Sequence, residues 1–155
     1  MKKLLATGVA LSIGLAAWTG HAGAQLLSST GPVIAIFDGE LLVGEATGHL
    51  GGWGTIAVRS RAEAGRTCVG EFSHGEAPGD AGQLRCSDGA SATFRFARLS
   101  LRRGYGGSVS GSGLSFTYGL SAEDSVAYLK LPAGKQLRGE GDSLELVAAV
   151  PLPSR

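Results

Sequence analysis

The most regular feature of the chain is an alternation of apolar and polar positions with a period of two, which is the period of a β-strand. The alternation is clearest over residues 114–120, LSFTYGL. Shorter apolar runs at residues 33–37, 41–46 and 53–59 are separated by segments rich in glycine. Short strands joined by tight turns are typical of an antiparallel β protein. We therefore expect a mainly β fold, an antiparallel meander that closes toward a small barrel or sandwich.

A hairpin is predicted around the turn signal GEAPG at residues 75–79, because Cys68 and Cys86 lie symmetrically about Ala77 at its centre. Folding there puts three pairs of residues on one face: Cys68 with Cys86, Gly70 with Leu84, and Phe72 with Gly82. Opposite residues in such a pair have Cβ atoms close enough to join with a small adjustment. We expect a disulfide between Cys68 and Cys86 that faces the core.

A third strand follows this hairpin, and its alternation changes phase after residues 94–96, FRF. Leu99 and Leu101 are out of phase with the two phenylalanines. A one-residue β-bulge near residues 97–98 would return both leucines to the core and turn Arg98 to solvent. We therefore predict a bulge at that position.

The C-terminal part of the chain is less regular. Residues 102–113 are rich in glycine and serine, and we expect a mobile loop there. Ser121 precedes two acidic residues, which favours a helix cap and a short helix at about 122–130. A linker and a strand or tail follow at residues 139–155, and the pattern leaves open whether residues 144–150 join the sheet.

The N-terminus has the features of a secretory signal peptide. Two lysines precede an apolar run over residues 4–18, and Ala22-Gly23-Ala24 fits a small-x-small cleavage site. We expect residues 1–24 to be removed, 25–32 to form a polar lead-in and 33–138 to form one β domain with its helix. The mature chain is then periplasmic or secreted and has no membrane span.

Composition narrows the possible functions. The formal net charge of the 155-residue chain is +1, so no global charge attracts nucleic acid, and we expect no nucleic-acid partner. Two cysteines in an exported chain favour one disulfide. The 26 glycines are interspersed with Val, Ile, Thr and Phe, a composition of strands and turns rather than disorder.

A weak internal repeat covers residues 37–96. Residues 37–41, FDGEL, align with 68–72, CVGEF, and the same shift aligns three later glycines, with Asp88-Gly89 as a closing pair. This pattern resembles the MORN repeat, which implies β-hairpin units and contact with a protein or lipid surface. The whole chain is also similar to small exported bacterial β-proteins that have no assigned function.

Few residues offer chemistry. The mature chain has His49 and His74, and His74 with Glu76 and Asp80 is a weak candidate metal set that lacks the spacing of a secure site. We find no nucleophile motif and expect no catalytic residues and no cofactor. The alternative left open is a metal-dependent protein or hydrolytic enzyme that uses His49, His74 and nearby acids.

Four arginines and a tyrosine form the remaining candidate site: Arg95, Arg98, Arg102, Arg103 and Tyr105. They are either the solvated face of a strand and its loop or a contact surface for an anionic partner. We predict a non-catalytic periplasmic or secreted binding or structural module that contacts a protein, a glycan or a lipid headgroup on the envelope. The identity of that partner is left open.

Overall fold

The computed structural model describes residues 28–62, 64–75, 79–109 and 113–151. The predicted signal peptide at residues 1–24 lies outside this part of the chain, as do Gln25 and the first residues of the lead-in.

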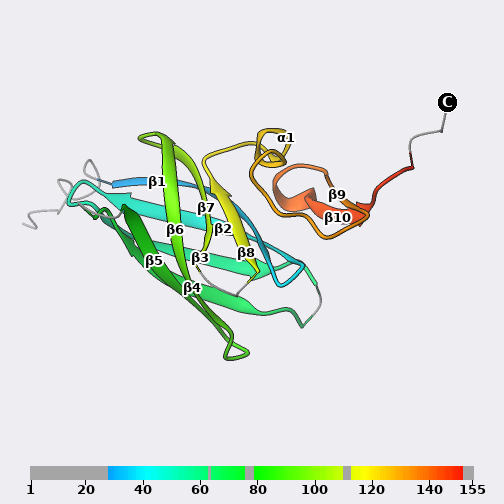
Figure 1. The fold of residues 1–155 in the computed structure, drawn as a ribbon, viewed down its shortest axis with the longest axis horizontal. Coiled ribbons are helices and arrows are strands. Elements are labelled where there is room, and N and C mark those ends of the chain that lie inside the picture. Colours follow the sequence, from blue (N-terminus) through cyan, green and yellow to red (C-terminus); the bar gives the residue numbers. More distant parts are fainter. Residues whose placement is uncertain (1–27, 63, 76–78, 110–112, 152–155) are drawn as a thin grey trace, which may run out of the picture.

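Eight consecutive antiparallel strands form a closed barrel, in which each strand pairs with the next and β1 pairs with both β2 and β8 (Figure 1). The predicted meander is confirmed, and it closes as a barrel. The strands are β1 (Ser28–Phe37), β2 (Glu40–His49), β3 (Trp53–Ser60), β4 (Thr67–Ser73), β5 (Asp80–Cys86), β6 (Ser91–Ser100), β7 (Arg103–Ser108) and β8 (Leu114–Tyr118).

The inner face of the barrel is apolar because every second side chain points inward. In β3, for example, Ile56 and Val58 are buried while their neighbours Ala57 and Arg59 are exposed. One continuous core results, and its largest buried members are Phe37, Leu42, Ile56, Leu84, Phe94, Leu114 and Phe116.

The predicted hairpin is confirmed with its register. β4 pairs with β5 so that Cys68 lies opposite Cys86 and Gly70 opposite Leu84. Cys68 and Cys86 form a disulfide, and Cys68 is buried in the barrel core. The turn at residues 76–78 lies outside the described residues.

The mobile loop predicted at residues 102–113 is wrong for its first half, because β7 occupies Arg103–Ser108 and pairs with β6 and β8. Glycine is needed in this strand because aromatic rings of β8 cross its inner face. A Cβ added to Gly106 would lie 2.6 Å from Cζ of Phe116, and one added to Gly104 would lie 2.4 Å from the Tyr118 hydroxyl. Glycine content here marks close packing rather than flexibility.

The bulge lies slightly later than predicted, between Arg98 and Ser100. Its consequence is opposite to the prediction. Arg98 stays on the inner face of β6, whereas Leu99 is 49% exposed and Leu101 is 91% exposed. An inward arginine is tolerated because this end of the barrel is open and Asp80 pairs with the guanidinium at 3.0 Å.

β1 begins at Ser28, earlier than the apolar run that starts at Val33. The first half of the strand pairs only with β2, and pairing with β8 starts at Val33. Pro32 is the last residue before that pairing begins, and its carbonyl oxygen accepts a hydrogen bond from Gly119 N, so its missing N–H falls where the β1–β8 ladder starts.

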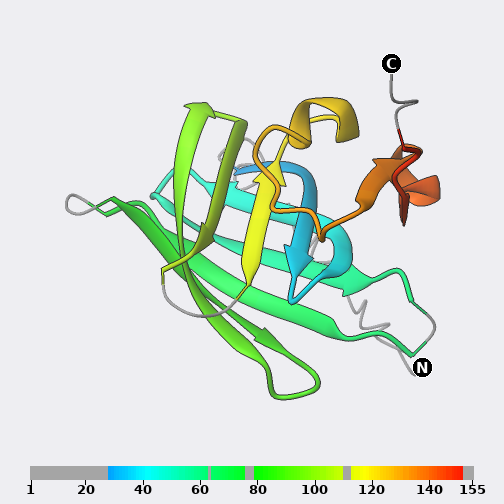
Figure 2. The ribbon, with the colours of Figure 1, turned by 45° about the vertical axis from the view of Figure 1, so that its right-hand side comes forward.

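A C-terminal segment packs against the outside of the barrel, as Figure 2 shows. It contains α1 (Ala122–Ser125), β9 (Lys135–Arg138), the 3-10 turn η2 (Gly141–Ser143) and β10 (Glu145–Ala148). The helix is shorter than the predicted span of 122–130, although Ser121 does cap it by accepting a hydrogen bond from Asp124 N. β10 pairs with β9 in a separate two-stranded sheet and does not join the barrel.

This segment covers outward-facing apolar residues of the barrel wall. Ile34, Ile36 and Leu41 form a second core with side chains of the segment, namely Ala122, Leu129 and Leu144. Hydrogen bonds also join the barrel to the C-terminal segment. Thr117 and Ser125 share a buried hydrogen bond, and Ser115 Oγ accepts one from Lys130 N.

Candidate functional site

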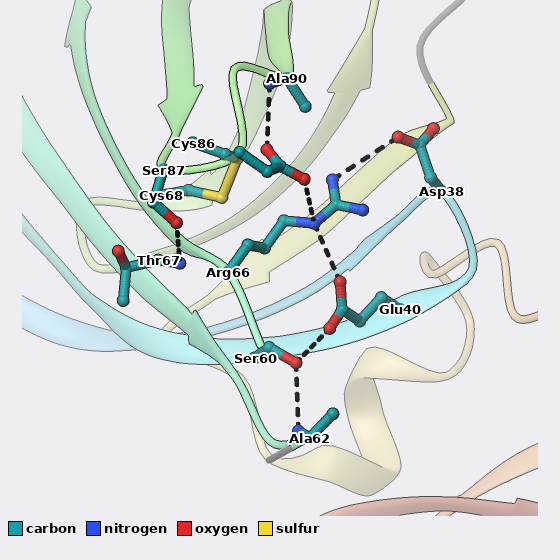
Figure 3. A network of polar contacts seen from close by, with 11 residues as sticks. Asp38, Glu40, Ser60, Ala62, Arg66, Thr67, Cys68, Cys86, Ser87 and Ala90 are labelled. Atoms are coloured by element: carbon teal, nitrogen blue, oxygen red, sulfur yellow. Dashed lines mark hydrogen bonds and ion pairs between the residues drawn. A yellow bond between two sulfur atoms is a disulfide. The ribbon is translucent and has the colours of Figure 1, made fainter. Parts of the chain in front are cut away.

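One end of the barrel is closed by a polar network around Arg66 (Figure 3). The Arg66 guanidinium pairs with three carboxylates, at 2.9 Å from Glu40, 3.3 Å from Asp88 and 3.6 Å from Asp38. It also lies over the ring of Phe37, 5.0 Å from the centroid. Because Phe37 is buried, this end is filled by the ring and capped by the arginine.

The other end is open and leads into a cavity of about 440 Å³. Residues of the β2–β3 and β6–β7 turns line it, together with His74 just after β4, the start of β1 and the end of β8. Cavities of this size are typical of small-molecule sites. An eight-stranded barrel is just wide enough to hold one such ligand.

Aromatic side chains form most of the inner wall of this cavity. Phe72, Phe94, Phe96, Phe116 and Tyr118 all line it. Successive rings meet edge to face, with centroids 5.4 Å apart for Phe72 and Phe96 and 5.0 Å apart for Phe94 and Phe116. The rings come from β4, β6 and β8, and they support one another in a fixed arrangement.

A polar cluster lies at the mouth, centred on the buried carboxylate of Asp80. His74 Nδ1 is 3.1 Å from one carboxylate oxygen, and Arg98 Nε is 3.0 Å from the other. The Asp80 side chain is 10% exposed, so the Arg98 guanidinium compensates a charge that would otherwise be buried alone, and His74 adds a second contact. Asp80 therefore holds His74 and Arg98 in place at the rim.

Tyr118, on β8, lies close enough to this cluster for the charges of Arg98 and Asp80 to affect its hydroxyl. Burial raises the pKa of its hydroxyl above the ordinary value of 10.0; Arg98 opposes that rise and Asp80 adds to it. The phenol is therefore protonated at neutral pH and can donate a hydrogen bond into the cavity.

The candidate binding residues do not form one strip. Arg98 and Arg102 line the cavity mouth. Arg103 and Tyr105 point outward from β7, where Arg103 pairs with Asp124 at 3.1 Å and Tyr105 stacks on Tyr128 with centroids 4.4 Å apart. Arg95 is exposed on the outer face of β6. The barrel wall therefore divides the set into a mouth pair and an outer group.

The two histidines both lie at the mouth. His74 N donates to Gly52 O on the neighbouring turn, and His49 stacks on Trp53 with ring centroids 4.0 Å apart. Both histidines line the cavity. Of the weak metal set, His74 and Asp80 are in contact and Glu76 lies outside the described residues.

Across the described ranges, no group of three or more His, Cys, Asp and Glu side chains is placed to hold a metal ion. The His74–Asp80 pair has the geometry that orients a general base.

Sequence reasoning missed the cavity because it treated the aromatic residues only as core. One signal was present: glycines recur at positions that face aromatic residues on the next strand, as Gly82 faces Phe72 and Phe94. Such pairs imply rings that lie flat along the wall. That arrangement leaves the barrel axis less filled than branched side chains would.

No helix within the described residues is long and apolar enough to cross a membrane. Comparison with known proteins found no matching family, no similar curated protein and no similar solved structure. The site therefore has to be interpreted from its own geometry.

Proposed function

We propose that this protein is a non-catalytic binding module that takes a small, largely apolar ligand into the open end of its barrel. The observation that carries this proposal is the aromatic-lined cavity at one end of a barrel whose other end is closed. A cavity lined by aromatic rings, with a few polar groups fixed at one side, is the common form of a small-molecule site.

The rim of the opening supports the same proposal. Leu50 is 79% exposed and Leu101 is 91% exposed, and both line the mouth. Exposed apolar side chains around a cavity are typical of ligand-binding sites. A ligand that enters between these two leucines buries apolar surface at the rim as well as inside.

Export to the periplasm or the extracellular space is part of the proposal, supported by the predicted signal peptide and the disulfide. Contact with a protein or envelope surface through the five candidate residues stays a prediction. Because the barrel divides that set, we restrict the functional part of it to Arg98 and Arg102 at the mouth.

The test is binding of a neutral apolar fluorophore, N-phenyl-1-naphthylamine, whose emission rises in a dry environment. We expect saturable binding by the wild-type protein. Ala46→Trp should abolish it, because Ala46 lines the cavity on β2 and an indole would fill the space. Ala97→Trp is the matched control, since Ala97 is exposed on β6 and does not line the cavity.

Two results would overturn the proposal. One is the absence of saturable fluorophore binding by folded wild-type protein. The other is equal binding by Ala46→Trp and wild type, which would place the fluorophore elsewhere on the molecule. Far-ultraviolet circular dichroism of each variant confirms that the barrel is folded.

A further inference from the structure

We propose that the ligand of this cavity is an anionic amphiphile, with an apolar body among the aromatic rings and an anionic head at Arg98 and Arg102. This inference rests on the binding function proposed above and names the chemical class of ligand. The shared chemistry is one carboxylate or phosphate group on an apolar chain.

The interior fits the body of such a ligand. The deeper lining residues are Val33, Ile56, Phe94 and Phe116, all at most 5% exposed. No charged side chain lies among these deeper residues. A polar group placed at this depth would lose its hydration without a partner, which is costly. The deep part of the cavity therefore selects an apolar chain or ring.

The mouth has the opposite character. The charged side chains of the described lining are two arginines, Arg98 and Arg102. No aspartate or glutamate is among these lining residues, since Asp80 lies behind His74 and Arg98. A ligand at the mouth meets cationic groups, while the compensating carboxylate stays out of reach.

Arg98 is well placed to hold an anion. Asp80 engages its Nε edge, and a guanidinium carries five N–H groups in a fixed fork. The ion pair fixes the plane of the guanidinium without using all of its donors. Arginine forks match carboxylate and phosphate oxygens, and such charge-assisted bonds are about twice as strong as neutral ones.

Arg102 adds a second cation on the β6–β7 turn, and the protonated Tyr118 hydroxyl adds a neutral donor on the cavity wall. Because Asp80 compensates Arg98, Arg102 provides the net positive charge among the described residues of the mouth. An anionic head is attracted by this arrangement, whereas a cationic head is repelled.

The experiment is displacement of N-phenyl-1-naphthylamine by four amphiphiles of equal chain length, each below the concentration at which it forms micelles. They are dodecanoate, dodecyl phosphate, dodecanol and dodecyltrimethylammonium. We expect at least one anion to bind about tenfold or more tightly than dodecanol, which corresponds to about 1.4 kcal/mol. The preference should weaken with added salt, because the mouth is partly exposed. Comparison of dodecanoate with dodecyl phosphate shows whether the mouth prefers a carboxylate or a phosphate head group.

Substitutions of single arginines test whether the preference for anionic amphiphiles comes from the mouth. Arg102→Gln should weaken binding of the anions several-fold more than binding of dodecanol. The neighbouring Arg103→Gln removes the same charge from the outer face, where Arg103 pairs with Asp124, and should retain the preference. Arg98→Gln should remove most of the preference, and retained fluorophore binding shows that this variant still folds around its cavity.

The outcomes separate this inference from the proposed function. Equal affinity for the anions and dodecanol, or tightest binding of the cationic amphiphile, overturns the anionic class while the cavity function stands. Equal loss of the preference in Arg102→Gln and Arg103→Gln overturns the assignment to the mouth. Failure of the fluorophore itself to bind overturns both.

Discussion

Gly82 lies where β4, β5 and β6 bring two phenylalanine rings to one point of the inner wall. A Cβ added there would lie 2.5 Å from Cζ of Phe94 and 2.4 Å from the carbonyl oxygen of Glu71. We predict that Gly82→Ala destabilises the fold by about 1 to 3 kcal/mol, because ring and backbone both have to move. Urea unfolding of the variant measures this loss.

Gly48→Ala is the matched control for this prediction. Its added Cβ would approach Phe72 no closer than 3.9 Å, which is ordinary contact. We expect its stability to equal or slightly exceed that of wild type, because alanine restricts the unfolded chain. Equal effects of the two substitutions would contradict the packing explanation.

The buried Tyr118 hydroxyl should make the free energy of unfolding depend on pH in the alkaline range. Since burial raises the pKa of its hydroxyl above 10.0, the folded protein retains a proton that the unfolded chain loses. The unfolding free energy should therefore fall as pH rises above about 10 through the folded-state pKa. Unfolding midpoints across that range should decline less in Tyr118→Phe. Parallel declines in the two proteins would show that other groups cause the loss.

At the scale of the element, the disulfide joins β4 to β5 across a sequence separation of 18 residues. Closing a loop of this length stabilises a protein by about 3 kcal/mol, mainly by restricting the unfolded chain. We predict that the double variant Cys68→Ala, Cys86→Ala loses about 2 to 5 kcal/mol. Denaturant unfolding measures this loss. Two free thiols in exported wild-type protein, or unchanged stability of the variant, would contradict it.

The C-terminal segment is an element of a different kind, because it covers the barrel from outside. Leu129 is 8% exposed and packs in the second core with Ile34 and Ile36. We predict that Leu129→Ala costs about 2 to 5 kcal/mol in unfolding free energy. Val126→Ala is the control, since Val126 is 47% exposed. A loss no larger than that of the control would show that the segment is not part of the cooperative fold.

At the scale of the whole molecule, cleavage of the predicted signal peptide would leave the barrel intact, because β1 begins at Ser28, after the expected new terminus at Gln25. We predict that the exported protein has the mass of residues 25–155 with one disulfide and no lipid. Intact-mass spectrometry tests this. A mass that still includes residues 1–24, or that carries a diacylglycerol, would contradict it.

At the scale of the whole molecule, the two ends of the barrel also differ. One end is closed by Phe37 and Arg66, and the other is open and cationic. Successive turns of an antiparallel meander lie at opposite ends of the barrel, so the two ends are built from different turns. At the closed end one guanidinium meets three carboxylates, which leaves an excess of negative charge, whereas at the open end Arg102 has no ionic partner among the described residues.

The sequence by itself determined the features that depend on short-range order. The register of β4 with β5, the pairing of Cys68 with Cys86 and the cap at Ser121 follow from a period of two, a turn signal and a hydroxyl before acidic residues. Each involves neighbours in the chain or strands joined by one turn, so local pattern is enough to specify it.

Only the tertiary structure decided which residues share the cavity. Closure of β1 on β8, the inward position of Arg98 and the exposure of Leu101 depend on strands far apart in the sequence. The rule that places charge outside and leucine inside fails at an open barrel end, because water reaches the inner face and Asp80 from β5 compensates Arg98. That compensation exists only once the barrel has closed, and for this reason no local pattern could predict it.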